Sequence, residues 1–247
     1  MYSTTIIGNG NLGYNFSLAL KKVDGFKLYQ WYGRNWDAEK LNKKLINNFS
    51  ELKKADLFIL AVSDNSIIDI LKHLNKNYFV VHCSGSTSIE VFKNFKRAGV
   101  IFPIQTINKV KKSSFVGTPF CIEAKSKIDL EILKKLIKGI NGTYKCLNSN
   151  KRANIHLSAV WINNFVNHMI SKGKKICKEN NISFSLMEPI LKRTISQAIK
   201  YNPDELQTGP AVRNDKNTLK LHSNLIKDFD DKKLYEIITK SIQKNYE

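Results

Sequence analysis

The feature that most constrains this chain is a glycine pattern directly after its first apolar run, Thr4–Ile7. The letters that follow are GNGNLG, which hold three glycines in the spacing GxGxxG. One such glycine makes a tight turn, one lets a pyrophosphate approach the backbone, and one lets helix and strand pack closely. The N–H groups that open the helix then face the phosphates. The pattern predicts a dinucleotide site; an ordinary glycine-rich turn is the alternative. The candidate contacts are Gly8, Asn9, Gly10, Asn11, Leu12 and Gly13.

The first 147 residues alternate short apolar runs with amphipathic segments, which is typical of βαβ units around a mostly parallel sheet. The expected strands are Thr4–Ile7, Lys27–Tyr32, Asp56–Val62, Tyr78–His82, Val100–Ile104, Pro119–Glu123 and Thr143–Leu147. The expected helices are Asn11–Lys22, Asn65–Leu74 and Ser126–Ile140. After about Asn148 the strand signals stop and helical patterns follow. We therefore expect an α/β protein, with a Rossmann NADP-binding domain at residues 1–147 and an all-α substrate and dimerisation domain at residues 148–247.

The end of the second expected strand decides which dinucleotide fits. NAD-binding domains place Asp or Glu there to hold the ribose 2′-hydroxyl, whereas this chain has Arg34 and Asn35. A guanidinium pairs with a 2′-phosphate, which an acidic side chain would repel. Five of the 40 basic residues are arginine, so an arginine here differs from the general surface charge. We therefore predict NADP(H) as the cofactor, held by Arg34 and Asn35; a solvent-facing arginine is the alternative.

Two further loops follow expected strands at the carboxyl edge of the sheet, where folds of this kind bind ligands. One contains Val62 and Ser63, and the other contains Ser84 within the letters HCSGS. Small and polar residues at both places suit the nicotinamide ribose, so Val62, Ser63 and Ser84 are predicted cofactor contacts. The alternative is that both loops only end their strands.

The first expected helix of the C-terminal half carries a polar strip. At about 100° per residue, Arg152, His156, Asn163 and Asn167 share one side, and Asn164 lies a little further round. The opposite side is apolar and consists of Ile155, Trp161, Ile162, Phe165, Val166 and Met169. We expect a largely buried helix whose polar strip faces a cleft. His156 is the candidate proton donor and Asn164 the candidate orienting hydrogen-bond partner; for His156 a core histidine is the alternative.

A second unusual segment has the letters TGPAVRND at residues 208–215. Thr-Gly-Pro forces a turn. Arg213 and Asp215 either anchor an anionic substrate or pair with each other as a structural staple. We predict Thr208, Arg213 and Asp215 as substrate contacts.

These motifs together resemble a known family. The order GNGNLG, GRN, AVSD, HCSGS and FPIQT, then IHLSAVWINNF and TGPAVRND, is similar to that of Rossmann-like oxidoreductases whose C-terminal helical domain is catalogued as domain of unknown function 2520. That family is similar to pyrroline-carboxylate reductases, deazaflavin-dependent NADP reductases, 6-phosphogluconate dehydrogenases and atypical ketopantoate reductases. The resemblance covers essentially the whole chain and adds Gln105, in the FPIQT motif, as a substrate contact. The chain departs from it at Phe102, where many relatives have His before Pro103.

Composition argues against several other classes. The chain has 247 residues, of which 42% are hydrophobic and 25% charged, as in globular proteins. Its net charge is +19, but the lysines are scattered rather than gathered into a contiguous face, so we expect no nucleic-acid binding. The longest uncharged stretch, 153–171, holds eight Asn, His or Ser residues, so we expect no membrane span. The four cysteines form no CxxC pair, so we expect no metal site and a reducing, cytoplasmic location.

The sequence therefore predicts an NADP(H)-dependent oxidoreductase that reduces a small carbonyl or imine substrate, such as a 2-keto acid like ketopantoate. The positive charge favours a small anionic substrate. We expect a homodimer formed through the helical half, whose apolar residues exceed what one edge of a Rossmann domain covers. The alternative is a non-catalytic NADP(H)-binding sensor or regulatory protein, in which apolar side chains fill the space beside the nicotinamide.

Overall fold

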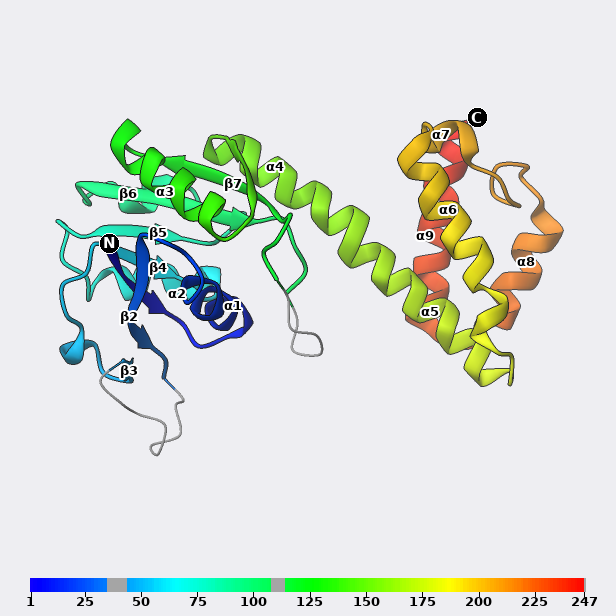
Figure 1. Ribbon diagram of the computed structural model, residues 1–247. Helices are drawn as coiled ribbons and strands as arrows, with labels where there is room; N and C mark the ends of the chain where they lie inside the picture. Colours follow the sequence, from blue (N-terminus) through cyan, green and yellow to red (C-terminus); the bar gives the residue numbers. More distant parts are fainter. Residues whose placement is uncertain (35–43, 108–113, 247) are drawn as a thin grey trace. The chain divides into compact units, whose positions relative to one another are not determined.

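The computed structural model describes residues 1–34, 44–107 and 114–246 (Figure 1). The chain divides into two compact units, Met1–Ile162 and Asn163–Glu247. The first unit contains a sheet with helices, and the described part of the second is helical. The expected fold class, a Rossmann-type α/β domain followed by an all-α region, is confirmed.

The first unit is built on one eight-stranded sheet. Its strands are β1 (Tyr2–Ile7), β2 (Phe26–Tyr32), β3 (Leu45–Ile46), β4 (Leu57–Leu60), β5 (Phe79–His82), β6 (Arg97–Pro103), β7 (Pro119–Ala124) and β8 (Thr143–Cys146). Their order is β3-β2-β1-β4-β5-β6-β7-β8, and neighbours run parallel except for the antiparallel pair of β6 and β7. The first six strands have the Rossmann order, in which the direction of strand addition reverses between β1 and β4.

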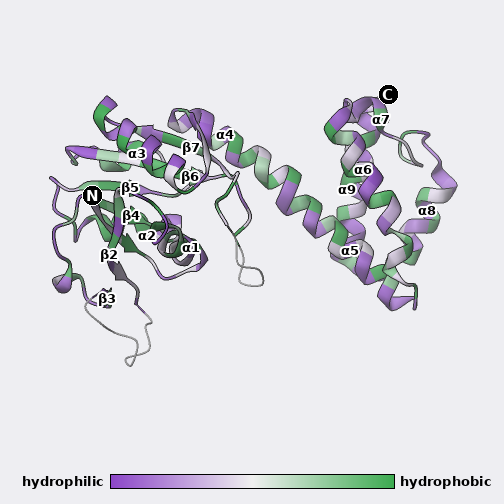
Figure 2. Ribbon diagram, viewed as in Figure 1, coloured by the Kyte–Doolittle hydropathy of each residue, from purple (hydrophilic) through white to green (hydrophobic). Residues whose placement is uncertain are grey.

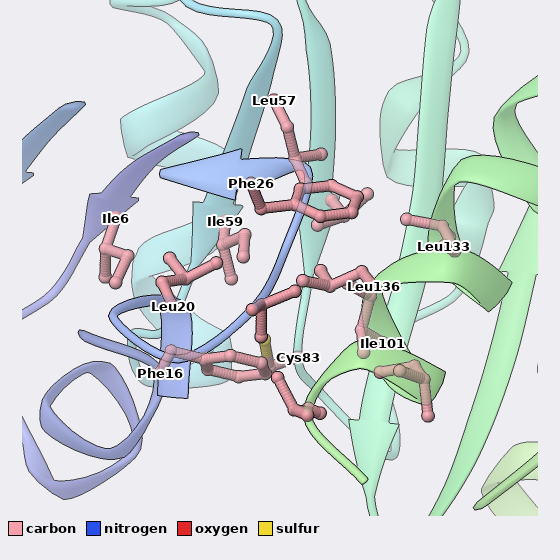
Figure 3. Packing of buried hydrophobic residues seen from close by; sticks show 14 of the residues in the cluster. Ile6, Phe16, Leu20, Phe26, Leu57, Ile59, Cys83, Ile101, Leu133 and Leu136 are labelled. Atoms are coloured by element: carbon pink, nitrogen blue, oxygen red, sulfur yellow. The ribbon is translucent and has the colours of Figure 1, made fainter. Parts of the chain in front are cut away.

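Helices cover both faces of this sheet. They are α1 (Asn11–Leu20), α2 (Asp64–Leu71) and α3 (Lys127–Gly139), with the 3-10 turns η2 (Phe49–Glu51) and η3 (Ile89–Phe92). Successive residues of a strand point to opposite faces. Ile6 accordingly joins the cluster of Phe16 on α1 and Leu136 on α3 (Figure 3), while Ile7 joins the cluster that contains Ile67 of α2. Strands buried on both faces leave the carboxyl edge of the sheet as the place for a ligand.

The helical region begins with α4 (Ser149–Ala159), which continues through the π-helical turn η4 (Val160–Phe165) into α5 (Val166–Glu179). The remaining elements are η5 (Phe184–Leu186), α6 (Glu188–Lys200), α7 (Pro203–Leu206), α8 (Lys216–Leu225) and α9 (Phe229–Tyr246). The sequence places the domain boundary at residue 148, where the strands end, whereas the compact units divide after Ile162, inside the π-helical turn. The difference arises because the buried Arg152 ties α4 to Glu123 on β7.

The helices that follow the sheet contain many hydrophobic residues (Figure 2), and many of the large ones are exposed. The largely buried apolar face expected for the first of them is not found in the single chain, where Trp161 is 62% exposed and Ile162 is 73% exposed. Among the described residues of the second unit, the buried hydrophobic residues are Cys177 and Ala211. Exposed apolar surface of this extent marks an interaction surface. Within the described ranges, no helix has the combination of length and apolar character that crossing a membrane requires.

Candidate functional site

A cavity of about 500 Å³ lies at the carboxyl ends of β1, β2 and β4, where the strand order reverses. Parts of the chain that are distant in sequence meet there: the turn after β1, the end of β2, and the loop that joins β4 to α2. The predicted cofactor contacts that line it are Gly8, Asn9, Gly10, Asn11, Leu12, Arg34, Val62 and Ser63. The structure thus brings together residues that the sequence associates with one ligand.

The three glycines of the turn have different surroundings. Gly8 has a φ of +117°, in the left-handed region that favours glycine. A Cβ on Gly8 would lie 2.2 Å from the backbone oxygen of Ala61, and a Cβ on Gly13 would lie 2.0 Å from the backbone oxygen of Gly8. A Cβ on Gly10 would meet nothing within 4 Å. Gly8 and Gly13 therefore allow backbone segments of the protein to pack closely together. Gly10 lines the cavity, and the space beside it is empty.

The N-terminus of α1 lies at this open position. Gly10 is the residue before the helix, and no side chain caps the helix there. The first N–H groups of a helix lack partners within it and carry a partial positive charge. The first turn, described throughout, contains no acidic residue, and Asn11 and Leu12 both line the cavity. This arrangement fits the pyrophosphate of a dinucleotide.

Arg34 lines the cavity at the end of β2, while Asn35 lies outside the described residues. Three rings stack in a column in the same wall. The centroids of Tyr32 and Phe49 are 4.2 Å apart at an interplanar angle of 20°, and those of Phe49 and His73 are 4.5 Å apart at 3°. The sequence does not indicate Phe49 and His73, because nothing local shows that η2 and the residues just after α2 meet the end of β2.

An acidic side chain, Asp69, also lines the cavity. Lys72 Nζ donates to Asp69 Oδ1 over 2.7 Å, and this hydrogen bond is the main cause that lowers the pKa of the Asp69 carboxyl. Its negative charge is therefore balanced in part by a lysine one turn further along α2. Throughout the described ranges, no group of three or more His, Cys, Asp or Glu residues is placed to hold a metal ion.

Ser84, a predicted cofactor contact, shapes the loop after β5 instead of lining the cavity. Its hydroxyl accepts hydrogen bonds from the backbone N–H of Ser86 at 3.2 Å and of Thr87 at 2.9 Å. Its own N–H donates to Nδ1 of the buried His82 at 3.2 Å. The Ser86 hydroxyl donates to Asp64 at the start of α2 over 2.6 Å. The loop is therefore fixed to the neighbouring helix through its serine side chains.

His156 lies on α4, half-buried, against this same loop. A Cβ on Gly85 would lie only 2.4 Å from His156 Cδ2, so the imidazole rests directly on the glycine. The ring of Phe102, on β6, meets the imidazole edge-on with centroids 5.7 Å apart. Gly85 follows the carboxyl end of β5, next to β4 in the sheet. The candidate proton donor therefore lies at the carboxyl edge of the sheet, the edge that also holds the cavity.

Two predicted residues already have partners within the chain. The Gln105 amide donates to the backbone oxygen of Ser114 at 3.1 Å and accepts from the hydroxyl of Thr118 at 3.2 Å. Asn164 is exposed and belongs to the second unit, where its Oδ1 accepts from Asn163 Nδ2 at 3.0 Å. Gln105 and His156 thus belong to the unit that holds the cavity, and Asn164 does not.

The segment at residues 208–215 also belongs to the second unit. Asp215 caps α8: its carboxylate accepts from the N–H of Thr218 at 3.1 Å and from its hydroxyl at 2.7 Å. These hydrogen bonds are the main cause that lowers the pKa of Asp215, with a smaller contribution from Arg213. Arg213 and Asp215 are both described, and no ion pair joins them. Thr208 and Arg213 are exposed.

The polar strip expected along the first C-terminal helix is interrupted. Arg152 and His156 are one turn apart on α4, as regular helical spacing requires. The π-helical turn Val160–Phe165 lies between them and Asn167 and contains Asn163 and Asn164. A π turn closes a wider ring than an α turn. The rotation of about 100° per residue that the sequence pattern assumes therefore does not hold across this π-helical turn.

Comparison with protein-family models matches residues 118–242 to the family described as a domain of unknown function, DUF2520. The match covers just over half of the 247 residues. No curated protein matches the chain.

Solved structures resemble the chain over almost its full length. A Bacteroides fragilis protein described provisionally as an NADP oxidoreductase is 29% identical, with a TM-score of 0.87 and 98% of both chains covered. A Thermotoga maritima protein is 25% identical, with a TM-score of 0.67 and 98% of both chains covered. Pyrroline carboxylate reductase from Plasmodium falciparum, solved with NADP bound, is 12% identical, with a TM-score of 0.56 and coverage of 100% of this chain and 98% of that one. The last likeness shows the fold alone.

Proposed function

The chain belongs to the DUF2520 family, and from this premise we propose that it is an NADP(H)-dependent oxidoreductase that reduces a small anionic carbonyl or imine compound. The observation that carries the proposal is the cavity, whose wall combines an uncapped helix N-terminus with the open space at Gly10. The Bacteroides fragilis protein is described as an NADP oxidoreductase, which supports the cofactor class.

Different residues of the cavity bind different parts of the dinucleotide. The turn from Gly8 to Gly13 and the N-terminus of α1 hold the pyrophosphate, Arg34 holds the 2′-phosphate, and Val62 and Ser63 border the ribose on the nicotinamide side. When bound, the nicotinamide supplies the hydride.

The rest of the chemistry requires a proton and an anchor for the substrate. His156, on α4, donates the proton to the developing oxyanion or amine, and its imidazole rests on Gly85 of the loop after β5, at the carboxyl edge of the sheet. Arg213 is exposed and not paired with Asp215, so its guanidinium is free to hold a substrate carboxylate. Asn164 orients the reacting group, and Gln105 and Thr208 are further candidate contacts.

The experiment that tests this function follows the loss of NADPH absorbance against a panel of 2-keto acids, ketopantoate and cyclic imines. Turnover of one compound supports the proposal and identifies the substrate class. NADPH that binds tightly but is oxidised by no compound of the panel favours the non-catalytic sensor instead. Failure to bind either NADPH or NADH contradicts both functions.

We expect NADP(H) to bind more tightly than NAD(H), because a charge-assisted contact from Arg34 to the 2′-phosphate contributes about 1.5 to 3 kcal/mol. That corresponds to a difference in Kd of about 10- to 100-fold. Arg34→Ala should remove most of this preference, whereas Arg193→Ala, at an exposed position on α6, should leave it intact. Kd values for both nucleotides, measured by titration, check the prediction. Equal binding of NAD and NADP by the wild type refutes it.

We also propose that the protein is a homodimer formed through the second unit. Its helices leave large apolar side chains in solvent, including Ile199 at 83% and Phe229 at 77% exposure, and bury few. Covering such surface with a second copy gains hydrophobic free energy. Sedimentation velocity should show a particle of twice the 28.3 kDa chain mass. A monomer at every concentration contradicts the prediction.

A further inference from the structure

The residue that attaches α4 to the sheet is a buried arginine. Arg152 has 0% exposure and is the buried residue of this helix. Its Nη1 donates to Glu123 Oε2 on β7 at 2.5 Å, and its Nη2 donates to the backbone oxygen of Thr87 at 2.5 Å. Burying a guanidinium is costly unless it is paired and hydrogen-bonded. Nη1 and Nη2 meet this requirement at the start of the helix that carries His156, whereas the buried Nε has no hydrogen-bond partner among the described residues.

Ser149 completes the cluster. Its hydroxyl donates to Glu123 Oε2 at 2.8 Å and accepts from Arg152 Nη2 at 3.1 Å and from the backbone N–H of Ile89 at 2.9 Å. The cluster therefore joins three elements: α4, β7, and the segment after β5 that contains Thr87 and Ile89. This segment also contains Gly85, on which His156 lies.

Apolar side chains alone could attach a helix, and buried ion pairs can often be replaced by them without loss of stability. A guanidinium also orients the helix that it attaches, because its donors are fixed in one plane and its hydrogen bonds are directional. Arg152 and His156 are one turn apart on the same side of α4. The hydrogen bonds of Arg152 to β7 and to Thr87 consequently constrain the rotation of α4 about its axis, and with it the direction of the Cα–Cβ bond of His156, whose ring then rests on Gly85.

We propose that Arg152, Glu123 and Ser149 form a clamp that positions His156 against the loop after β5. Arg152 and Glu123 are then positioning residues for proton donation, a role that rests on the proposed function of His156.

The test replaces the clamp by apolar residues that keep its volume, in the double variant Arg152→Met with Glu123→Leu. Arg97 and Asp129 supply the control, because they form another arginine–carboxylate pair in the same unit, at 2.6 Å between β6 and α3, in which Asp129 is buried and the Arg97 side chain is 42% exposed. The control variant is Arg97→Met with Asp129→Leu. Ser149→Ala is a milder clamp variant in case the double variant does not fold.

Two readouts are needed, and the first does not depend on activity. The ¹H and ¹⁵N signals of the His156 ring, assigned by their loss in His156→Gln, should shift in the clamp variants and stay in place in the control. The second is steady-state NADPH oxidation with whichever panel compound the wild type reduces. Turnover should fall about 10- to 100-fold in the double variant, while the KM for NADPH changes less than about twofold, because the clamp residues do not line the cavity.

The possible outcomes test the clamp separately from the proposed catalytic role of His156. His156 signals that stay in place in both clamp variants overturn the proposal, whatever the turnover. Shifted signals with reduced turnover in the clamp variants alone support it. Shifted signals together with normal turnover of His156→Gln support the clamp as a positioning device but remove His156 from the chemistry.

Discussion

Replacing His156 with alanine is expected to lower turnover by about 10² to 10⁴ while leaving the affinity for NADPH nearly unchanged. Proton donation stabilises the transition state and contributes nothing to the binding of the cofactor. The structure agrees with this separation, because His156 lies on Gly85 and is not among the residues that line the cavity. The measurement is steady-state kinetics with the reduced panel compound, together with a fluorescence titration of NADPH.

His168→Ala is the matched control, since His168 is an exposed histidine on the following helix, α5. It should retain wild-type turnover. If His156→Ala keeps a normal kcat and only its melting temperature falls, His156 is a packing residue that supports the Gly85 loop and Phe102, and the catalytic assignment is wrong.

Acidification is expected to remove about 3 kcal/mol of unfolding free energy through His82 alone as the pH falls from about 7 to about 4. Burial lowers the pKa of His82 from 6.5 to about 4, and the cation of Arg152 adds to the effect. The unfolded chain therefore takes up this proton more readily than the folded one. The contribution of His82 to stability is complete above its unfolded pKa of 6.5 and is lost as the pH falls from there through about 4.

The variant His82→Phe isolates this contribution. It keeps an aromatic ring stacked on Phe92, whose centroid lies 5.4 Å away, but cannot take up a proton. It also removes the acceptor for the Ser84 N–H, and because the variant lacks this hydrogen bond at both pH values, its own loss of stability on acidification is not affected. Urea unfolding of both proteins at about pH 7 and about pH 4 should therefore show a smaller loss for the variant, by about 3 kcal/mol. Equal losses mean that His82 is not held neutral by burial.

The sheet is predicted well from local pattern, for a physical reason. Strands such as Leu57–Leu60 and Phe79–His82 are buried on both faces, so they appear in the sequence as short continuous apolar runs between polar turns. All seven expected strands overlap observed ones. The added strand, β3, has two residues, too few for any periodicity to indicate it.

The candidate site is predicted only in part. The glycine turn, Arg34, Val62 and Ser63 are expected to share a ligand, and all of them except Gly13 line one cavity. Ser84 is chosen for its place after a strand, but the hydrogen bonds of its hydroxyl depend on how the loop folds back on itself. Asp215 is chosen for its charge, yet its carboxylate caps α8.

The sequence by itself determined the strand, glycine turn and helix at the N-terminus, because the contact that demands glycine at position 13 is with Gly8, within the same short segment. Only the tertiary structure decided that Arg152 is buried against Glu123, 29 residues away, and that His156 rests on Gly85. The physical reason is that a helical pattern records which residues share a side of the helix. Which distant carboxylate or glycine that side meets depends on how sheet, loop and helix pack together.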